Sequence, residues 1–192
     1  MSVTINGNGT ISGVSVGGLP DGIVDTDMLA AGAATQAKRT YATGEIIQMK
    51  TDIRAGVYVD LTAGTAKQIP FGADLEVSIT LLDTNNKLYV SVFIPDCYNF
   101  ATGTRSFHAG LSYSTDNFST TTSIGNDNLS THINYHGAND AFLNPTSYDT
   151  SVACPTTTPI KIRPHFTPNN GAIRLVANSA GVAQITVMEI KG

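Results

Sequence analysis

Apolar residues recur at every second position through most of the chain after Gly44. Leu75, Val77 and Ile79, for example, alternate with Glu76 and Ser78. This period places apolar side chains on one face of an extended strand and polar side chains on the other, so we expect β-strands that each turn one face to a core. The further runs with this pattern cover residues 57–61, 88–94, 107–113, 160–163, 173–176 and 185–188.

The strands predicted in this way are short and are separated by turn residues. Asn85-Asn86 and Asn169-Asn170-Gly171 have the side chains that tight turns favour. In the run 88–94, Tyr89 and Phe93 alternate with aliphatic residues, which predicts a strand buried on both sides. A set of short strands with no helical pattern among them predicts an antiparallel β-sandwich, which we assign to a head domain of residues 44–192.

Residues 1–43 have a different character. They are polar and rich in glycine, and they lack the apolar surface needed to fold alone, so we expect an extended stalk that becomes ordered in an assembly. Asp25 or Thr26 can cap a short helix over about residues 25–38. Because that helix is only about three turns long, it is marginal in isolation. Packing of three copies around an axis would stabilise it, and docking on its own head domain is the alternative.

The stalk also carries a resemblance. Three stalk segments and the closing run of the head resemble segments of bacteriophage tail-fibre and head-fibre proteins. They are Thr10-Ile11-Ser12-Gly13, Gly18-Leu19-Pro20-Asp21-Gly22-Ile23-Val24-Asp25-Thr26-Asp27-Met28-Leu29-Ala30, Ala33-Ala34-Thr35-Gln36-Ala37-Lys38 and Gln184-Ile185-Thr186-Val187-Met188-Glu189-Ile190-Lys191-Gly192. The resemblance implies a virion protein, assembled in the bacterial cytoplasm, whose mostly β chain forms homotrimers with jelly-roll-like heads. A short tail fibre for host attachment is the first expectation, and a capsid head fibre or decoration protein is the alternative.

Roles along the stalk follow from its expected position between particle and head. The N-terminal segment is expected to contact other virion proteins. Its apolar residues are the candidates for the virion anchor, and those of the helical segment are the candidates for the trimer stalk. The anchor candidates are Ile5, Ile11, Val14, Val16 and Leu19, and the stalk candidates are Ile23, Met28 and Leu29.

The alternation breaks down in residues 114–157, which are rich in Ser, Thr, Asn and Asp. Long loops in a compact domain are often functional, and flat rings beside amides and hydroxyls suit a host-surface glycan or protein. The alternative is that these loops only cover the ends of the sandwich or pack against a neighbouring subunit. The receptor-binding candidates are Tyr135, Phe142, Tyr148, His132 and His136.

Charge and hydropathy exclude several other classes. Charged residues make up 14% of the chain, against about 25% in ordinary soluble proteins, and the net charge is −4. An acidic chain without a basic patch is not expected to bind nucleic acid. No apolar run approaches the length of about 20 residues that a membrane span needs, and Met1-Ser2-Val3-Thr4 does not begin a signal peptide.

Catalysis, metals and cofactors are not expected. No nucleophile elbow, phosphate-binding loop or dinucleotide fingerprint is present. His132 and His136 would lie about 13 Å apart on an extended chain, which is too far for a shared metal. Asp74 and Glu76 alternate along a strand and are expected on the surface. Cys97 and Cys154 are expected to be reduced thiols. A small glycan-processing enzyme is the remote third possibility.

Overall fold

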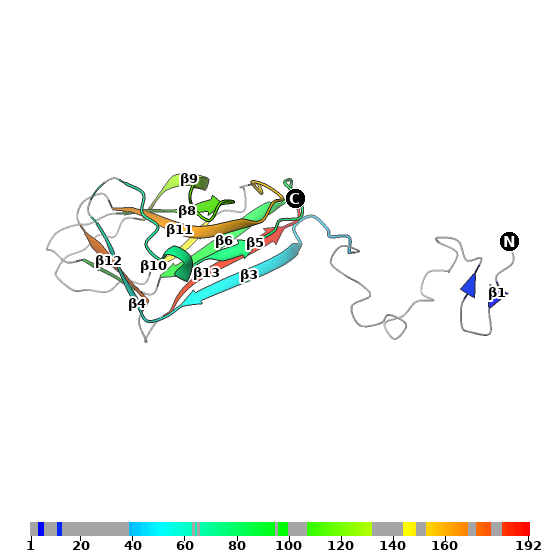
Figure 1. The fold of residues 1–192 in the computed structure, drawn as a ribbon, viewed down its shortest axis with the longest axis horizontal. Helices are drawn as coiled ribbons and strands as arrows, with labels where there is room; N and C mark the ends of the chain where they lie inside the picture. The colour runs from blue at the N-terminus through cyan, green and yellow to red at the C-terminus, as the bar shows by residue number, and fades with distance from the viewer. Residues whose placement is uncertain are drawn as a thin grey trace. The chain divides into compact units, whose positions relative to one another are not determined.

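The computed structural model (Figure 1) describes residues 4–5, 11–12, 39–62, 64, 66–94, 96–99, 107–131, 144–148, 153–168, 172–177 and 182–192. The chain divides into two compact units, Met1–Thr40 and Tyr41–Gly192. In the first unit, strands β1 (Thr4–Ile5) and β2 (Ile11–Ser12) pair in antiparallel fashion, with Ile5 opposite Ile11. The helix predicted over residues 25–38 lies outside the described residues, as do Val14, Val16, Leu19, Ile23, Met28 and Leu29.

The second unit is built on two antiparallel four-stranded sheets. Their strand orders are β10-β6-β13-β3 and β5-β11-β8-β9. Counted along the chain, the first sheet therefore contains the sixth, third, eighth and first strands of the sandwich, and the second contains the second, seventh, fourth and fifth. This is the strand order of a jelly roll, so the antiparallel sandwich predicted from the alternation is confirmed. The strands are β3 (Ile46–Arg54), β5 (Val77–Ile79), β6 (Lys87–Ile94), β8 (Phe107–Ser114), β9 (Thr122–Thr131), β10 (Asn144–Tyr148), β11 (Ile160–Pro168) and β13 (Ala183–Ile190).

The core lies between these two sheets. Val90 and Val92 of β6 face Ile185 and Val187 of β13 across the first sheet, and all four are buried. Their neighbours in sequence are partly exposed, so the period of two seen in the sequence corresponds to an inner and an outer face. The largest fully buried side chains are Leu61, Leu75, Ile79, Leu81, Leu88, Ile94, Leu111, Ile160, Ile162, Leu175 and Ile185.

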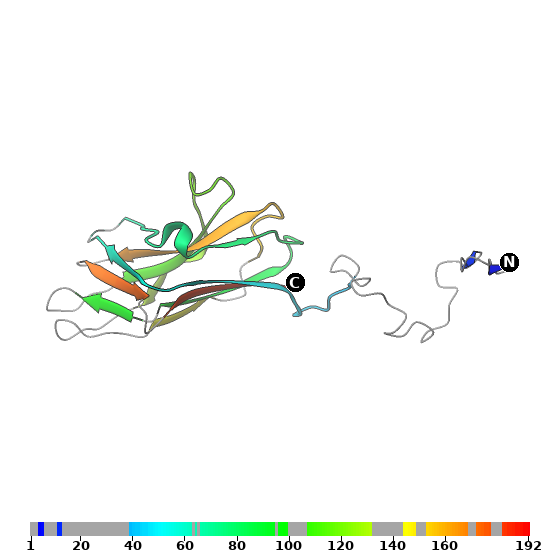
Figure 2. The same cartoon turned by 60° about the horizontal axis from the view of Figure 1, so that its bottom comes forward.

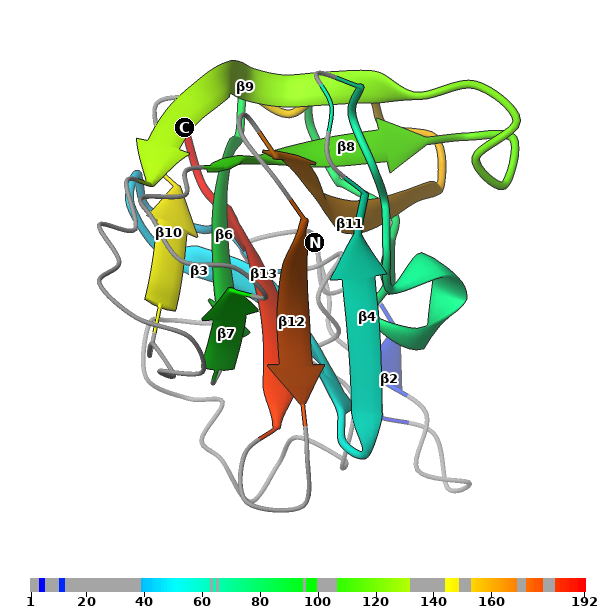
Figure 3. The same cartoon turned by 90° about the vertical axis from the view of Figure 1, so that its left-hand side faces the viewer.

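A third, three-stranded sheet closes one end of the sandwich (Figure 3). Its order is β4-β12-β7, with β4 at Val57–Leu61, β12 at Ile173–Ala177 and β7 at Asp96–Asn99. Each of these strands belongs to a connection that crosses from one main sheet to the other. We call this the end sheet, because all three connections cross at the same end of the jelly roll.

The chain enters the second unit at the opposite end. The Gly44 amide donates to the Lys191 carbonyl (2.8 Å), and the Lys191 amide donates to the Glu45 carbonyl (2.9 Å). The first residues of this unit are thus paired with the last ones, beside the C-terminus (Figure 2). The entry point and the end sheet therefore lie at opposite ends of the same sandwich.

Three sequence-based expectations need correction. Residues 114–157 are not all loop, because they include β9 and β10. Thr and Ser residues at both ends of β9 pair with β8, and hydroxyl-rich segments form strands once a partner satisfies the backbone. The run 88–94 is buried on one side only, since Tyr89, Ser91 and Phe93 are partly exposed. Strand β3 lies outside the predicted runs, because the polar Thr51 stands between Met49 and Ile53 on the same face and interrupts the apolar alternation. One short 3-10 helix, Gly72–Asp74, precedes β5.

Candidate functional site

The solvent-facing side of the end sheet carries aromatic and charged side chains. Val59, Leu61 and Leu175 point inward, and Leu61 and Leu175 are fully buried. The alternate positions Tyr58 and Asp60 of β4 lie on the opposite face with Arg174 of β12, which is the register partner of Asp60. Tyr58 is 59% exposed, which is high for a ring of its size. The sequence pattern contained this alternation, although it gave no sign that β4 and β12 would meet at the end of the molecule.

An ion pair fixes the centre of this face. Arg174 donates from Nε to Asp60 Oδ1 (2.6 Å) and from Nη2 to Asp60 Oδ2 (2.8 Å), which is a bidentate arrangement. The hydrogen bond from Arg174 lowers the pKa of Asp60, and the same bond raises the pKa of Arg174. The guanidinium carbon also lies 5.7 Å from the centroid of the Tyr58 ring, within cation–π range.

Strand β7 pairs with the edge of β12 opposite β4. Its register places Tyr98 opposite Arg174 and Asp96 opposite Val176. The solvent-facing side of the end sheet combines the large exposed ring of Tyr58 with the pre-oriented guanidinium of Arg174 and carboxylate of Asp60. Such a surface can stack against a flat ligand face and hydrogen-bond to hydroxyls or amides.

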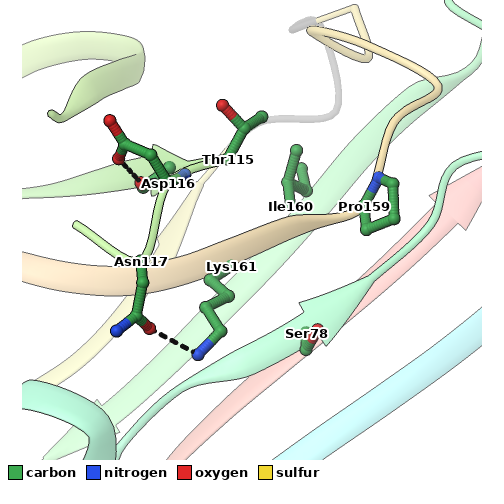
Figure 4. Close-up of a pocket in the computed structure, with 8 residues that line it drawn as sticks. Ser78, Thr115, Asp116, Asn117, Pro159, Ile160 and Lys161 are labelled. Atoms are coloured by element: carbon green, nitrogen blue, oxygen red, sulfur yellow. Dashed lines mark hydrogen bonds between the residues drawn. The ribbon is translucent and has the colours of Figure 1, made fainter. Parts of the chain in front are cut away.

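A pocket of about 380 Å³ lies at the other end of the sandwich. Figure 4 shows residues that line it. It is formed where β5 ends, where β8 turns toward β9 and where β11 begins. Lys161 Nζ donates to Asn117 Oδ1 (2.7 Å) beside it and also pairs with Glu76 (3.0 Å). The lining residues are Ser78, Ser114, Thr115, Asp116, Asn117, Pro159, Ile160 and Lys161.

The turn beside this pocket is tightly organised. Asp116 accepts hydrogen bonds from the Ser114 hydroxyl (2.6 Å) and from the amide and hydroxyl of Thr120 (3.0 and 2.7 Å). The hydroxyl of Ser114 is the largest cause that lowers the pKa of Asp116 to about 2. Asn117 and Phe118 both have positive φ, of 58° and 66°. Arg163 stacks on Phe118 at 3.9 Å, which helps to hold this uncommon conformation.

Glu76 does not behave as the sequence suggested. It was expected on the surface, but its side chain is only 11% exposed and pairs with Arg163 (2.6 Å) and Lys161. The reason is that β5 pairs with β11, which brings two basic side chains of β11 beside it. Asp74 is exposed as expected and lies 3.5 Å from Arg54.

The receptor-binding candidates taken from the sequence are only partly described. His132, Tyr135, His136 and Phe142 lie outside the described residues, in the connection between β9 and β10. The end of β9 and the start of β10 belong to the same end of the sandwich as the end sheet, because Thr131 pairs with Phe107 and Asn144 pairs with Ile94. Tyr148 is part of β10 and is the register partner of Val90.

One serine–histidine pair is present within the main sheets. Ser112 Oγ lies 2.9 Å from His165 Nδ1, and both residues are buried. Neither group is open to a substrate, so the contact joins β8 to β11 as an interior hydrogen bond. In the part of the chain that the structure describes, no three His, Cys, Asp or Glu side chains are grouped closely enough to hold a metal ion.

The described cysteine side chain is Cys154, a buried free thiol. Burial raises its pKa to about 12, and the nearby charges of Glu189 and Asp83 act in the same direction. Cys97 belongs to β7, where its register partner is Leu175. Among the described residues, no helix has the length and apolar character needed to cross a membrane.

No family model and no curated protein sequence matches the chain. Solved structures with some similarity come from infectious bursal disease virus. The Gx strain structure is 13% identical with a TM-score of 0.37, and it aligns with 77% of this chain and 33% of its own. The Gt strain structure is 11% identical with a TM-score of 0.40, and the alignment covers 91% of this chain and 43% of that one. The VP2 subviral particle is 12% identical with a TM-score of 0.38, and the alignment covers 74% of this chain and 41% of that one. This chain therefore spans less than half of each. These TM-scores are below 0.5, so they assign neither family nor function.

Proposed function

We propose that this protein is a structural component of a bacteriophage virion, a short homotrimeric tail fibre whose jelly-roll head contacts the host surface. The observation that carries the proposal is the polarity of the head. The chain enters beside Lys191, and the end sheet with Tyr58, Asp60 and Arg174 lies at the opposite end. A projection fixed through its N-terminal segment would present that end to the outside.

Two further observations support the proposal. The chain separates into an N-terminal unit of 40 residues and a head, as a fibre with an anchor requires. The N-terminal sequence resembles fibre stalks, with Ile5 and Ile11 paired across β1 and β2. The proposed role is non-catalytic. The proposed partners are other copies of the chain, virion proteins that hold the N-terminal segment, and a glycan or protein of the host surface.

The location on the particle decides between this role and that of a capsid head fibre or decoration protein. Virions of the phage that encodes the chain would be labelled with antibodies raised against the purified full-length protein and imaged by electron microscopy. Label at the tail, together with inhibition of phage adsorption by the free protein, is the expected result. Label spread over the capsid would support the alternative, and unlabelled virions would contradict both roles.

The oligomeric state is tested separately on the purified full chain. Multi-angle light scattering should give a mass near three times the 20.1 kDa of one chain. A single-chain mass at micromolar concentration would remove the trimer from the proposal.

A further inference from the structure

Strand β3 is amphipathic in the opposite sense to β13 and β6 of the same sheet. Its polar residues point toward the second sheet and bridge to the segment around β5. Lys50 Nζ donates to the Ser78 carbonyl (3.0 Å), and Gln48 Nε2 donates to the Thr80 carbonyl (2.7 Å). Asp52 Oδ2 accepts from the Glu76 amide (2.8 Å). These contacts close the open side of the sandwich and leave the other face of β3 to its apolar residues.

That other face is exposed. Met49 is 58% exposed and Ile53 is 56% exposed, and Ile46 at the start of the strand is 52% exposed. Three of the six large apolar side chains exposed among the described residues therefore belong to this one strand. β3 is also one of the two edge strands of its sheet (Figure 1). A long edge strand with apolar side chains is normally covered, because it otherwise promotes uncontrolled association.

The exposed face continues across β13 and β6. Residues that are directly opposite in antiparallel strands share a face, so the register defines its rows. We call the three central rows the outer face. No residue in these rows is charged. A fourth row, Ile46–Ile190–Lys87, borders the outer face at one end and includes the charged Lys87. The rows are Met49–Met188–Tyr89, Thr51–Thr186–Ser91 and Ile53–Gln184–Phe93.

Polar groups at the centre of the outer face are already paired with one another. Thr51 Oγ1 lies 3.1 Å from Thr186 Oγ1, and Gln184 Nε2 donates to the same Thr186 hydroxyl at 3.0 Å. Covering this face would therefore bury Thr51, Thr186 and Gln184 with these hydrogen bonds already made, which lowers the cost of burying them.

We propose that the outer face is the surface through which the heads of identical chains pack together in the homotrimer. The inference rests on the trimer of the proposed function and specifies where the heads touch. Because the chain carries a net charge of −4, an uncharged surface is one on which copies can meet without like-charge repulsion.

The position of β3 in the chain also favours a second copy as the occupant. In a threefold assembly, equivalent residues of the three copies meet only around the axis. The fibre-like N-terminal segment would follow that axis, and β3 begins six residues after the first unit ends at Thr40. Among the strands of the head, β3 is thus the closest in sequence to the segment that would follow the axis.

Oxidation of Met49 tests this contact in the full-length protein. Dilute hydrogen peroxide would be applied, and peptide mass spectrometry would give the oxidation rate of Met49, with the mass of each species measured by light scattering. In the trimer, Met49 should be protected despite its 58% exposure within one head. Ile53→Lys should accelerate Met49 oxidation and raise the dissociation constant, each by about tenfold or more, because burial of an unpaired charge in an interface is strongly unfavourable.

The matched control is Leu82→Lys, a change at a similarly exposed apolar residue (51%) outside the outer face. It should leave both readouts as in the wild type. If circular dichroism shows that Ile53→Lys does not fold, Ile53→Gln replaces it and should shift both readouts in the same direction by a smaller factor.

Three outcomes would overturn the inference. A trimer in which Met49 oxidises as fast in the wild type as in Ile53→Lys would show that the heads touch elsewhere, while the proposed trimer would stand. Protection of Met49 in a species with the mass of one chain would show that the N-terminal segment of the same chain covers the face. An unprotected single chain would contradict both this inference and the trimer.

Discussion

Asn86 Nδ2 donates a hydrogen bond of 2.6 Å to Glu189 Oε1, and both residues are almost completely buried. The same oxygen accepts from the amides of Leu82 (2.8 Å) and Asp83 (3.4 Å), and Oε2 accepts from Gln48 Nε2 (2.7 Å). This one carboxylate joins β13, β3 and the turn before β6. Through these hydrogen bonds, Glu189 holds the strands and the turn together at the end where the chain enters the head.

Glu189→Gln is therefore expected to destabilise the protein. An amide nitrogen in place of one oxygen would face donors instead of accepting from them, at a cost of about 1–3 kcal/mol in the free energy of unfolding. Urea unfolding measured by circular dichroism gives this value. Asp74→Asn is the control, since Asp74 is exposed and its change should stay within about 0.5 kcal/mol. Equal effects of the two substitutions would contradict the role assigned to Glu189.

Tyr58→Ala tests the end sheet as the attachment surface. Because the ring is 59% exposed, its removal should leave folding and assembly intact. If the ring is a contact anchor, attachment to host cells should weaken by about 1–3 kcal/mol, measured as loss of phage adsorption. Leu82→Ala, at the far end of the head, is the control and should adsorb normally. Unchanged adsorption of a folded Tyr58→Ala virion would move the contact to another surface, with Phe142 and Tyr148 as the next residues to replace.

The turn around Asp116 should respond to acid. Because its folded-state pKa of about 2 lies below the ordinary 3.8, the ionised carboxylate stabilises the turn above the ordinary value, and that stabilisation is lost as the pH falls from 3.8 toward 2. Ser114→Ala removes the strongest of its hydrogen bonds and should raise the pKa toward 3.8. Carboxyl chemical shifts followed by NMR during a pH titration measure this. A titration of Asp116 that is the same in both proteins would show that Ser114 does not set the pKa.

Cys154 should be chemically inert in the folded protein. With its pKa raised to about 12, almost none of the thiol is ionised at neutral pH, and the thiolate is the reactive form. Iodoacetamide should label it only after unfolding, as read by mass spectrometry. We also expect the melting temperature to be indifferent to reductant. A fall of many degrees on adding reductant would instead reveal a disulfide in the native protein.

The alternation of apolar and polar residues was sufficient to predict the fold class of the head. Alternation at Leu88–Ile94 and Ala183–Ile190 requires extended strands with one buried face, and this follows from the geometry of a single strand without knowledge of its neighbours. The turn at Asn85–Asn86 was equally local. Such features depend on a few adjacent residues, so they can be recognised before the chain is folded.

Which strands pair with one another depends on how the whole head packs. The strand order of the jelly roll and the placement of β4, β12 and β7 in one end sheet bring together separate segments of the chain, and the Asp60–Arg174 pair joins residues 114 positions apart. No local pattern encodes such pairings, because they depend on how the whole set of strands packs. The inverted strand β3 shows the same limit: whether Met49 and Ile53 face a core or the outside is settled by the sheet edge and by the polar bridges from its other face to β5.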